Sequence, residues 1–164
     1  MNQAPGTSTA VLLGLLLTLT VSATPASAQV HVGPQLSYGE NADMGIGVRA
    51  AVYDLGDSEE LSSWEGVGSF DYFFPGGGVD YLEVNLNGLY NFALGPDVPL
   101  HPYLGAGMNV ARTSVDDGPS SSDLGLNLLG GWKYEAESFT PFAEVRIEVG
   151  GGEQFVVTGG FLVP

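Results

Sequence analysis

Apolar and polar side chains alternate along most of the chain after residue 29. A period of two is typical of β-strands, whereas no sustained helical i, i+3, i+4 stripe is present in this region. Short segments rich in Gly, Pro, Asp and Ser interrupt the alternation and mark turns. The pattern therefore predicts an all-β domain with eight strands, near residues 29–38, 44–54, 66–74, 79–94, 100–113, 124–134, 139–149 and 153–163.

The two faces of these strands differ in character. Leu82, Val84 and Leu86 represent an apolar set, and the residues between them, Glu83 and Asn85, represent a set of small, polar and charged side chains. The charged residues in the middle of strands all belong to the polar set: Arg49, Asp71, Glu83, Lys133, Glu144, Arg146 and Glu148.

The composition of the polar face indicates which face is inside. A soluble barrel needs a charged exterior, but this polar face is mostly Gly and Asn, and the chain has 4 Lys and Arg residues in total. In a transmembrane β-barrel the apolar face meets lipid and the narrow interior takes small and polar residues. We therefore predict an apolar exterior. The alternative is a soluble secreted β-barrel or sandwich that turns its apolar face inward and binds an apolar ligand.

Aromatic residues of the apolar set fall near strand ends. Tyr and Trp concentrate at membrane–water interfaces, because the ring tolerates the acyl boundary while the polar tip stays hydrated. If the first strand rises from the periplasm, the sequence predicts a periplasmic girdle and an outer girdle. The first comprises Tyr90, Phe92, Trp132, Tyr134, Phe139 and Phe161, and the second comprises Tyr38, Tyr72, Phe74 and Phe155.

The N-terminal segment has the features of an export signal. Residues 11–21 read VLLGLLLTLTV, and Ala26-Ser27-Ala28 follows as a small-x-small cleavage pattern. The apolar run is too short for a helix that crosses a bilayer. We predict a cleaved secretory signal peptide at residues 1–28, an exported β-barrel domain at residues 29–164, and a location in the outer membrane.

Charge and composition restrict the remaining functions. A formal net charge of −15 argues against nucleic-acid binding, which depends mainly on Lys and Arg. The absence of Cys excludes disulfides and thiolate metal sites. The acidic segment DDGPSSSD at 116–123, with Glu40 and Asp43, supplies oxygen ligands but lacks the EF-hand spacing. We interpret it as a long solvated outer loop facing cationic groups, or as a sign of a high-salt habitat. No metal site and no cofactor are predicted.

The candidate chemistry of the bore is structural rather than catalytic. Side chains just fill an eight-stranded barrel, so Arg49, Glu83, Lys133, Glu144, Arg146 and Glu148 are interpreted as a packed ion-pair network. A narrow conducting pore is the alternative. A lipid-modifying barrel enzyme is another, but it needs Ser, His and a carboxylate near the outer leaflet. The two histidines, His31 and His101, are expected at the periplasmic end, so we predict a protein that is not an enzyme.

Three stretches resemble a known family: PYLGAGMNVAR at 102–112, FTPFAEVRIEVGGG at 139–152 and EQFVVTGGFLVP at 153–164. They are similar to the small bacterial outer-membrane β-barrels of the OmpA transmembrane-domain type. The resemblance implies an eight-stranded antiparallel up-and-down barrel, folding by the barrel assembly machinery, outer-membrane lipid as surroundings, and a role in anchoring, surface contact or envelope integrity. Two features depart from the family pattern. The chain ends in Val163-Pro164 rather than an aromatic residue, and the connection at 55–65 is long for a periplasmic turn, so a brief interfacial helix is expected there.

Overall fold

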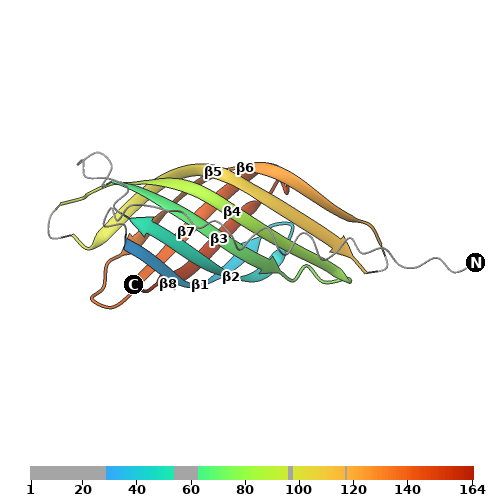
Figure 1. The fold of residues 1–164 in the computed structure, drawn as a ribbon, viewed down its shortest axis with the longest axis horizontal. Coiled ribbons are helices and arrows are strands. Elements are labelled where there is room, and N and C mark those ends of the chain that lie inside the picture. The colour runs from blue at the N-terminus through green and yellow to red at the C-terminus, as the bar shows by residue number, and fades with distance from the viewer. Residues whose placement is uncertain (1–28, 54–62, 96–97, 117) are drawn as a thin grey trace, which may run out of the picture.

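The computed structural model describes residues 29–53, 63–95, 98–116 and 118–164. It is a closed antiparallel barrel of eight strands in sequence order (Figure 1), as the alternation predicts. The predicted signal peptide and most of the 55–65 connection lie outside the described residues. The strands are β1 (Gln29–Gly39), β2 (Asp43–Tyr53), β3 (Trp64–Phe73), β4 (Val79–Asn91), β5 (Leu100–Val115), β6 (Ser120–Tyr134), β7 (Thr140–Gly150) and β8 (Phe155–Leu162).

Successive strands pair with their neighbours, and the last strand returns to the first. Tyr38 of β1 pairs with Val157 of β8, and an isolated bridge between Val32 and Val163 continues that seam. Closure pairs the edges that an open sheet would leave exposed, which is why closed barrels suit a solvent that cannot hydrogen-bond. The predicted fold class is therefore confirmed.

The segment at 116–123 is not the long outer loop that the sequence suggested. Strand β5 continues to Val115 and β6 begins at Ser120, so Ser122 pairs with Arg112 and Asp123 with Ala111. Ser120, Ser121 and Ser122 are all exposed, so their hydroxyls stay in solvent on both faces of the extended hairpin. Four residues, 116–119, separate the two strands, and the Gly118 amide donates to the Val115 carbonyl over 2.9 Å.

The barrel has two distinct ends. At the terminal end β1 begins and β8 ends, and β2, β4 and β6 end where β3, β5 and β7 begin. At the hairpin end lie the turns 40–42, 74–78, 116–119 and 151–154. In Figure 1 the terminal end is on the left, near the C label, and the tips of β5 and β6 at the hairpin end are on the right. The turn at 74–78 needs glycine, because Gly76, Gly77 and Gly78 all have positive φ angles of 66–74°.

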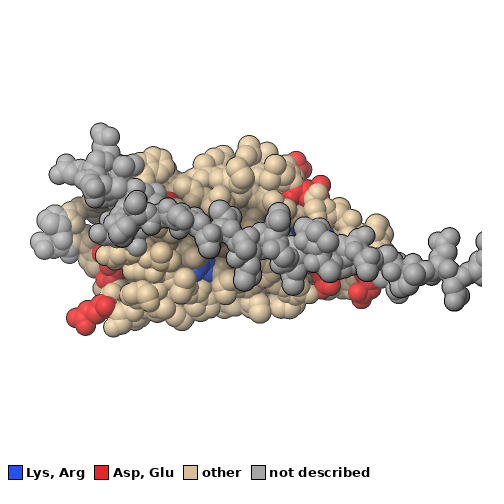
Figure 2. Space-filling view, viewed as in Figure 1, with Lys and Arg blue, Asp and Glu red and all other residues tan. Residues whose placement is uncertain are grey.

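The apolar set of side chains faces outward along every strand. Leu86 and Leu126 are 63% and 62% exposed, whereas the intervening Asn85 and Asn127 are each 1% exposed. This arrangement contradicts the alternative of an inward apolar face. Within the described ranges, no helix is long and apolar enough to cross a bilayer. Figure 2 shows acidic side chains toward the two ends and a mostly uncharged flank between them.

Candidate functional site

An ion pair crosses the bore in its terminal half. Arg49 of β2 donates from Nη2 to Glu144 Oε2 of β7 over 2.7 Å, and both side chains are almost fully buried. The Tyr103 hydroxyl donates to the same oxygen over 3.0 Å. The Arg49 guanidinium also lies 4.3 Å from the centroid of the Phe142 ring. The buried carboxylate of Glu144 thus has both a counter-ion, Arg49, and a neutral hydrogen-bond donor, Tyr103, which offset the cost of removing its charge from water.

A second ion pair lies beside the first. Lys133 of β6 bonds to the Glu65 carboxylate of β3, and its Nζ lies 4.6 Å from the Tyr53 ring centroid. Asn91 Nδ2 donates to the same carboxylate over 3.3 Å. The sequence interpretation missed Glu65 because that residue was assigned to the connection at 55–65. Glu65 and Asp71 are an even number of residues apart in β3, so their side chains share the face that lines the bore. This spacing is the sequence signal that could have identified Glu65.

Arg146 organises the hairpin half of the bore. Its Nε donates to Glu148 Oε1 over 2.7 Å and its Nη2 donates to Glu83 Oε2 over 2.9 Å. Glu83 Oε1 accepts from the Tyr81 hydroxyl at 2.6 Å and from Gln154 Nε2 at 2.8 Å. The structure thus places all six predicted network residues in the bore. Arg146 Nη1, 3.9 Å from Glu144 Oε1, connects the two halves.

Asp71 is a buried carboxylate with neutral donors. Gln35 Nε2 lies 2.7 and 2.9 Å from its two oxygens, and the Ser37 hydroxyl donates over 2.9 Å. The basic residues of the chain are Arg49, Arg112, Lys133 and Arg146, and none of them forms an ion pair with Asp71 in the described part of the structure. A layer of asparagines lies nearby in the bore, where Asn127 Nδ2 donates to Asn85 Oδ1 and Asn87 Oδ1 over 2.9 Å each.

Two clusters of apolar side chains lie in the bore, one toward each end. The terminal cluster takes one residue from each of β2 to β8: Ala51, Val67, Leu89, Tyr103, Leu129, Phe142 and Leu162. The hairpin cluster consists of Ala42, Phe73, Tyr81, Ala111 and Val156. The sequence interpretation described this face as small and polar and missed both clusters. The clusters lie toward strand ends, and their residues share the inward face with the polar set. Leu89, for example, is two residues from the buried Asn87 in β4 and points to the same side.

The aromatic residues expected at the interfaces all lie on the outside of the barrel. Trp132 is 58% exposed, Tyr38 50% and Phe74 51%, and Tyr90 makes edge contacts with Phe92 at 5.1 Å between ring centroids. Trp64 was missed by the sequence interpretation. It is exposed and its ring packs edge-on against Tyr90 at 5.4 Å.

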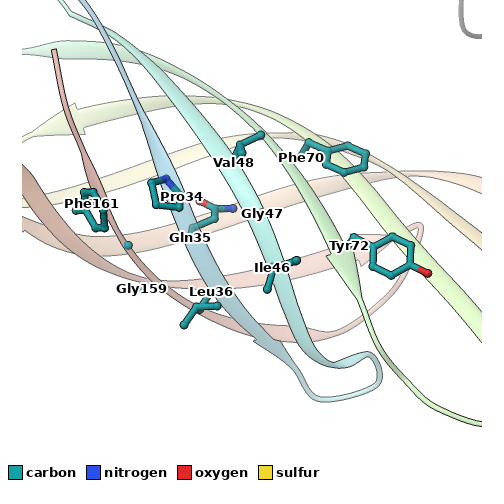
Figure 3. Close-up of a pocket in the computed structure, with 11 residues that line it drawn as sticks. Pro34, Gln35, Leu36, Ile46, Gly47, Val48, Phe70, Tyr72, Gly159 and Phe161 are labelled. Atoms are coloured by element: carbon teal, nitrogen blue, oxygen red, sulfur yellow. The ribbon is translucent and has the colours of Figure 1, made fainter.

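A shallow apolar groove of about 590 Å³ runs over the outside of β8, β1, β2 and β3. Figure 3 shows Phe161 on one side of it and Phe70 and Tyr72 on the other, with Leu36, Ile46 and Val48 between them. Gly159, which has the outward parity of Val157 and Phe161, contributes no side chain to the floor of the groove. Such a depression on a lipid-facing flank suits an acyl chain.

The histidines make local contacts near the terminal end. The His31 ring packs against Tyr53 with 4.8 Å between centroids, and His101 Nε2 lies 3.5 Å from Glu135 Oε2. No hydrogen bond found among the described residues joins either histidine to a serine hydroxyl.

No model of a known protein family and no curated protein matches the sequence. Solved structures do match the fold. The N-terminal β-barrel domain of Pseudomonas aeruginosa OprF is 19% identical, with a TM-score of 0.63, and the match covers 83% of this chain and 98% of that one. Neisserial surface protein A is 18% identical, with a TM-score of 0.57, over 82% of this chain and 94% of the other. A designed transmembrane β-barrel is 14% identical, with a TM-score of 0.54, over 85% and 97%.

These likenesses show that the chain has the fold of small eight-stranded membrane barrels. The resemblance that the sequence suggested is confirmed at the level of the fold.

Proposed function

We propose that this chain is an integral outer-membrane β-barrel with an anchoring or surface-interaction role. The observation that carries the proposal is the arrangement of its two faces. Leu86, Leu126 and their neighbours expose an apolar band, while Arg49, Arg146 and Glu83 are buried in the bore. Water would penalise such an exterior, and lipid accepts it. Export by the signal peptide at 1–28 and folding by the barrel assembly machinery belong to the same proposal.

The closed bore favours a structural role over transport. Two apolar clusters and the buried ion pairs occupy the interior, as expected for a barrel of this size. We therefore assign the function to the ends of the barrel and to its lipid-facing flank.

The hairpin end is the surface that would meet external partners if the terminal end faces the periplasm. Its exposed carboxylates belong to Glu40, Asp43, Asp80, Asp116, Asp123 and Glu153. Arg112 is the one basic residue of the chain outside the bore. A surface of this charge attracts cationic groups and repels anionic ones, with a range set by the ionic strength.

Membrane fractionation with gel electrophoresis tests this proposal. The barrel should remain with the outer membrane until detergent is added, and unboiled and boiled samples should migrate differently, because a closed barrel resists detergent unfolding. Release with the periplasm or the medium, together with identical migration, would contradict the proposal.

We also propose that the barrel performs no lipid chemistry. His31 and His101 contact Tyr53 and Glu135 rather than a nucleophile. Replacing both histidines with Ala should therefore leave the envelope lipids unchanged by mass spectrometry. Loss of a lipid species in the variant, with normal amounts of folded barrel, would favour a lipid-modifying enzyme instead.

A further inference from the structure

A small pocket lies at the hairpin end, on the outer face of the β3–β4 hairpin. It has a volume of about 220 Å³ and is lined by Tyr72, Phe74, Gly78, Asp80 and Asp116 among others. Tyr72 is two residues from the exposed Phe70 in β3, so its side chain shares the outward face. Asp80 is likewise four residues from the exposed Val84 in β4. Tyr72 and Phe74 belong to the predicted outer girdle, which is the level at which lipid headgroups lie.

Two carboxylates border this pocket from different segments of the chain. The Tyr72 hydroxyl donates to Asp80 Oδ1 of β4. Asp116 follows β5, and its amide donates to the Gly78 carbonyl over 2.9 Å, which attaches Asp116 to the β3–β4 turn. A Cβ at Gly78 would lie 3.1 Å from Asp116 Oδ2, so glycine at this position leaves the carboxylate uncrowded.

No cation of the barrel neutralises these two carboxylates. Among the described residues, none of the ion pairs involves Asp80 or Asp116. Arg112 lies on β5 four residues before Asp116, but its Nη2 donates to Ser120 Oγ of β6 over 3.4 Å. The other three basic residues of the chain are buried in the bore. A cationic ligand is therefore attracted to this pocket, and an anionic one is repelled.

The pocket adjoins the apolar groove of about 590 Å³ on the outside of β8, β1, β2 and β3, because Tyr72 lines both. In Figure 3 the Tyr72 ring stands at the edge of the groove, and its hydroxyl points away from Leu36 and Ile46. The Phe74 ring packs edge-on against Tyr72, with 5.1 Å between ring centroids. One depression is thus apolar and the other acidic, which matches a molecule that has an acyl chain and a cationic headgroup.

We propose that the groove and the pocket together bind one lipid whose headgroup carries a primary ammonium group, an inference that rests on the membrane location proposed above. The acyl chain occupies the groove, and the ammonium group contacts Asp80 and Asp116. A primary ammonium group has three N–H donors, and its hydrogen bonds to carboxylates are charge-assisted. The rings of Tyr72 and Phe74 also attract a cation. A quaternary ammonium group keeps the charge but has no N–H to donate, so it should bind more weakly.

Native mass spectrometry of the folded, detergent-solubilised barrel tests the proposal. The probes are phosphatidylethanolamine, phosphatidylcholine and phosphatidylglycerol with identical acyl chains. The fraction of barrel that carries one lipid should be highest with phosphatidylethanolamine and lowest with phosphatidylglycerol. Asp80→Asn and Asp116→Asn should each lower the affinity for phosphatidylethanolamine about fivefold, which is the upper value for an exposed ion pair.

Asp123→Asn is the matched control, since it removes the same charge from an exposed residue of the hairpin end that does not line the pocket. It should keep the full preference for phosphatidylethanolamine. Gly159→Leu adds a side chain to the floor of the groove. This variant should bind all three lipids more weakly and keep their order, because the groove holds the acyl chain and the pocket selects the headgroup.

Equal affinities of the native barrel for phosphatidylethanolamine and phosphatidylcholine would overturn the proposal. Equal losses in Asp80→Asn and Asp123→Asn would also overturn it, because the preference would then follow the net charge rather than the pocket. Either result would leave the proposed outer-membrane location intact, since fractionation tests that location separately.

Discussion

Arg146 is a buried cation held by carboxylates of the bore. It is 1% exposed and donates to two carboxylates, Glu83 and Glu148. Replacing it with Met leaves both carboxylates without their counter-ion, and breaking a buried pair in this way costs about 3–5 kcal/mol. Urea unfolding of the barrel in phospholipid vesicles should show a loss of this size.

The matched control is Arg112→Met, which removes an equal charge from an exposed position. Exposed charges contribute about 1 kcal/mol or less, so this variant should unfold close to the native barrel. Equal stabilities for the two variants would mean that Arg146 has no structural role in the network.

A substitution of Val145, in the middle of β7, tests whether the outer face of the barrel contacts lipid. Val145 is 46% exposed and points away from the bore. Replacement with Arg places a charge at the lipid-facing midplane, which costs about 2–4 kcal/mol, whereas Ser122→Arg beyond the apolar band should cost about 1 kcal/mol or less. Vesicle unfolding measures both changes. A Val145→Arg barrel as stable as the Ser122→Arg barrel would contradict a lipid-facing position.

For single residues, the alternation predicted which face of the barrel a side chain points to, but it did not predict which residues form ion pairs with one another. The parity of Leu126 and Asn127 fixes which of them faces outward, because successive side chains of a strand point to opposite faces. The partner of Lys133 was missed because Glu65 was assigned to a connection. Arg49 and Glu144 lie on β2 and β7, which are not neighbours in the sheet, so no local pattern could reveal their contact.

At the level of elements, the β5–β6 hairpin extends past the acidic segment. Thr113 pairs with Ser121 and Ala111 with Asp123, so these positions belong to strands. The amides of Ser121 and Asp123 face β5 and should exchange with solvent slowly, and the amide of the turn residue Gly118 should exchange faster. Hydrogen exchange of the detergent-solubilised barrel measures this contrast. Equally fast exchange at Ser121, Asp123 and Gly118 would restore the loop interpretation.

Element number and order followed from the sequence, whereas strand ends did not. Turn-forming residues separate the eight apolar alternations, and a closed meander joins consecutive strands by the shortest connections. The start of β6 was placed too late, because Ser120 and its neighbours read as a loop by composition. Backbone pairing with β5 overrides that local preference, and a single sequence does not display such pairing.

For the molecule as a whole, the two apolar clusters predict a barrel that does not conduct. The terminal cluster, with Leu89, Leu129 and Leu162, takes side chains from seven strands, and the hairpin cluster lies nearer the other end. Planar-bilayer recordings should therefore lack steady single-channel currents under conditions in which an added porin conducts. Steady currents that persist after repeated purification would favour the narrow-pore alternative.

The orientation of the two faces is the central claim, and nitroxide labels measure it directly. The chain has no Cys, so each introduced Cys is a unique labelling site. Labels at Leu86, Met108 and Leu126 in vesicles should collide often with oxygen, which concentrates in lipid, and rarely with a water-soluble nickel complex. A label at Ser121 should show the reverse preference. Low collision rates with both reagents at the three apolar positions would show that these side chains pack into a core, and would contradict the account.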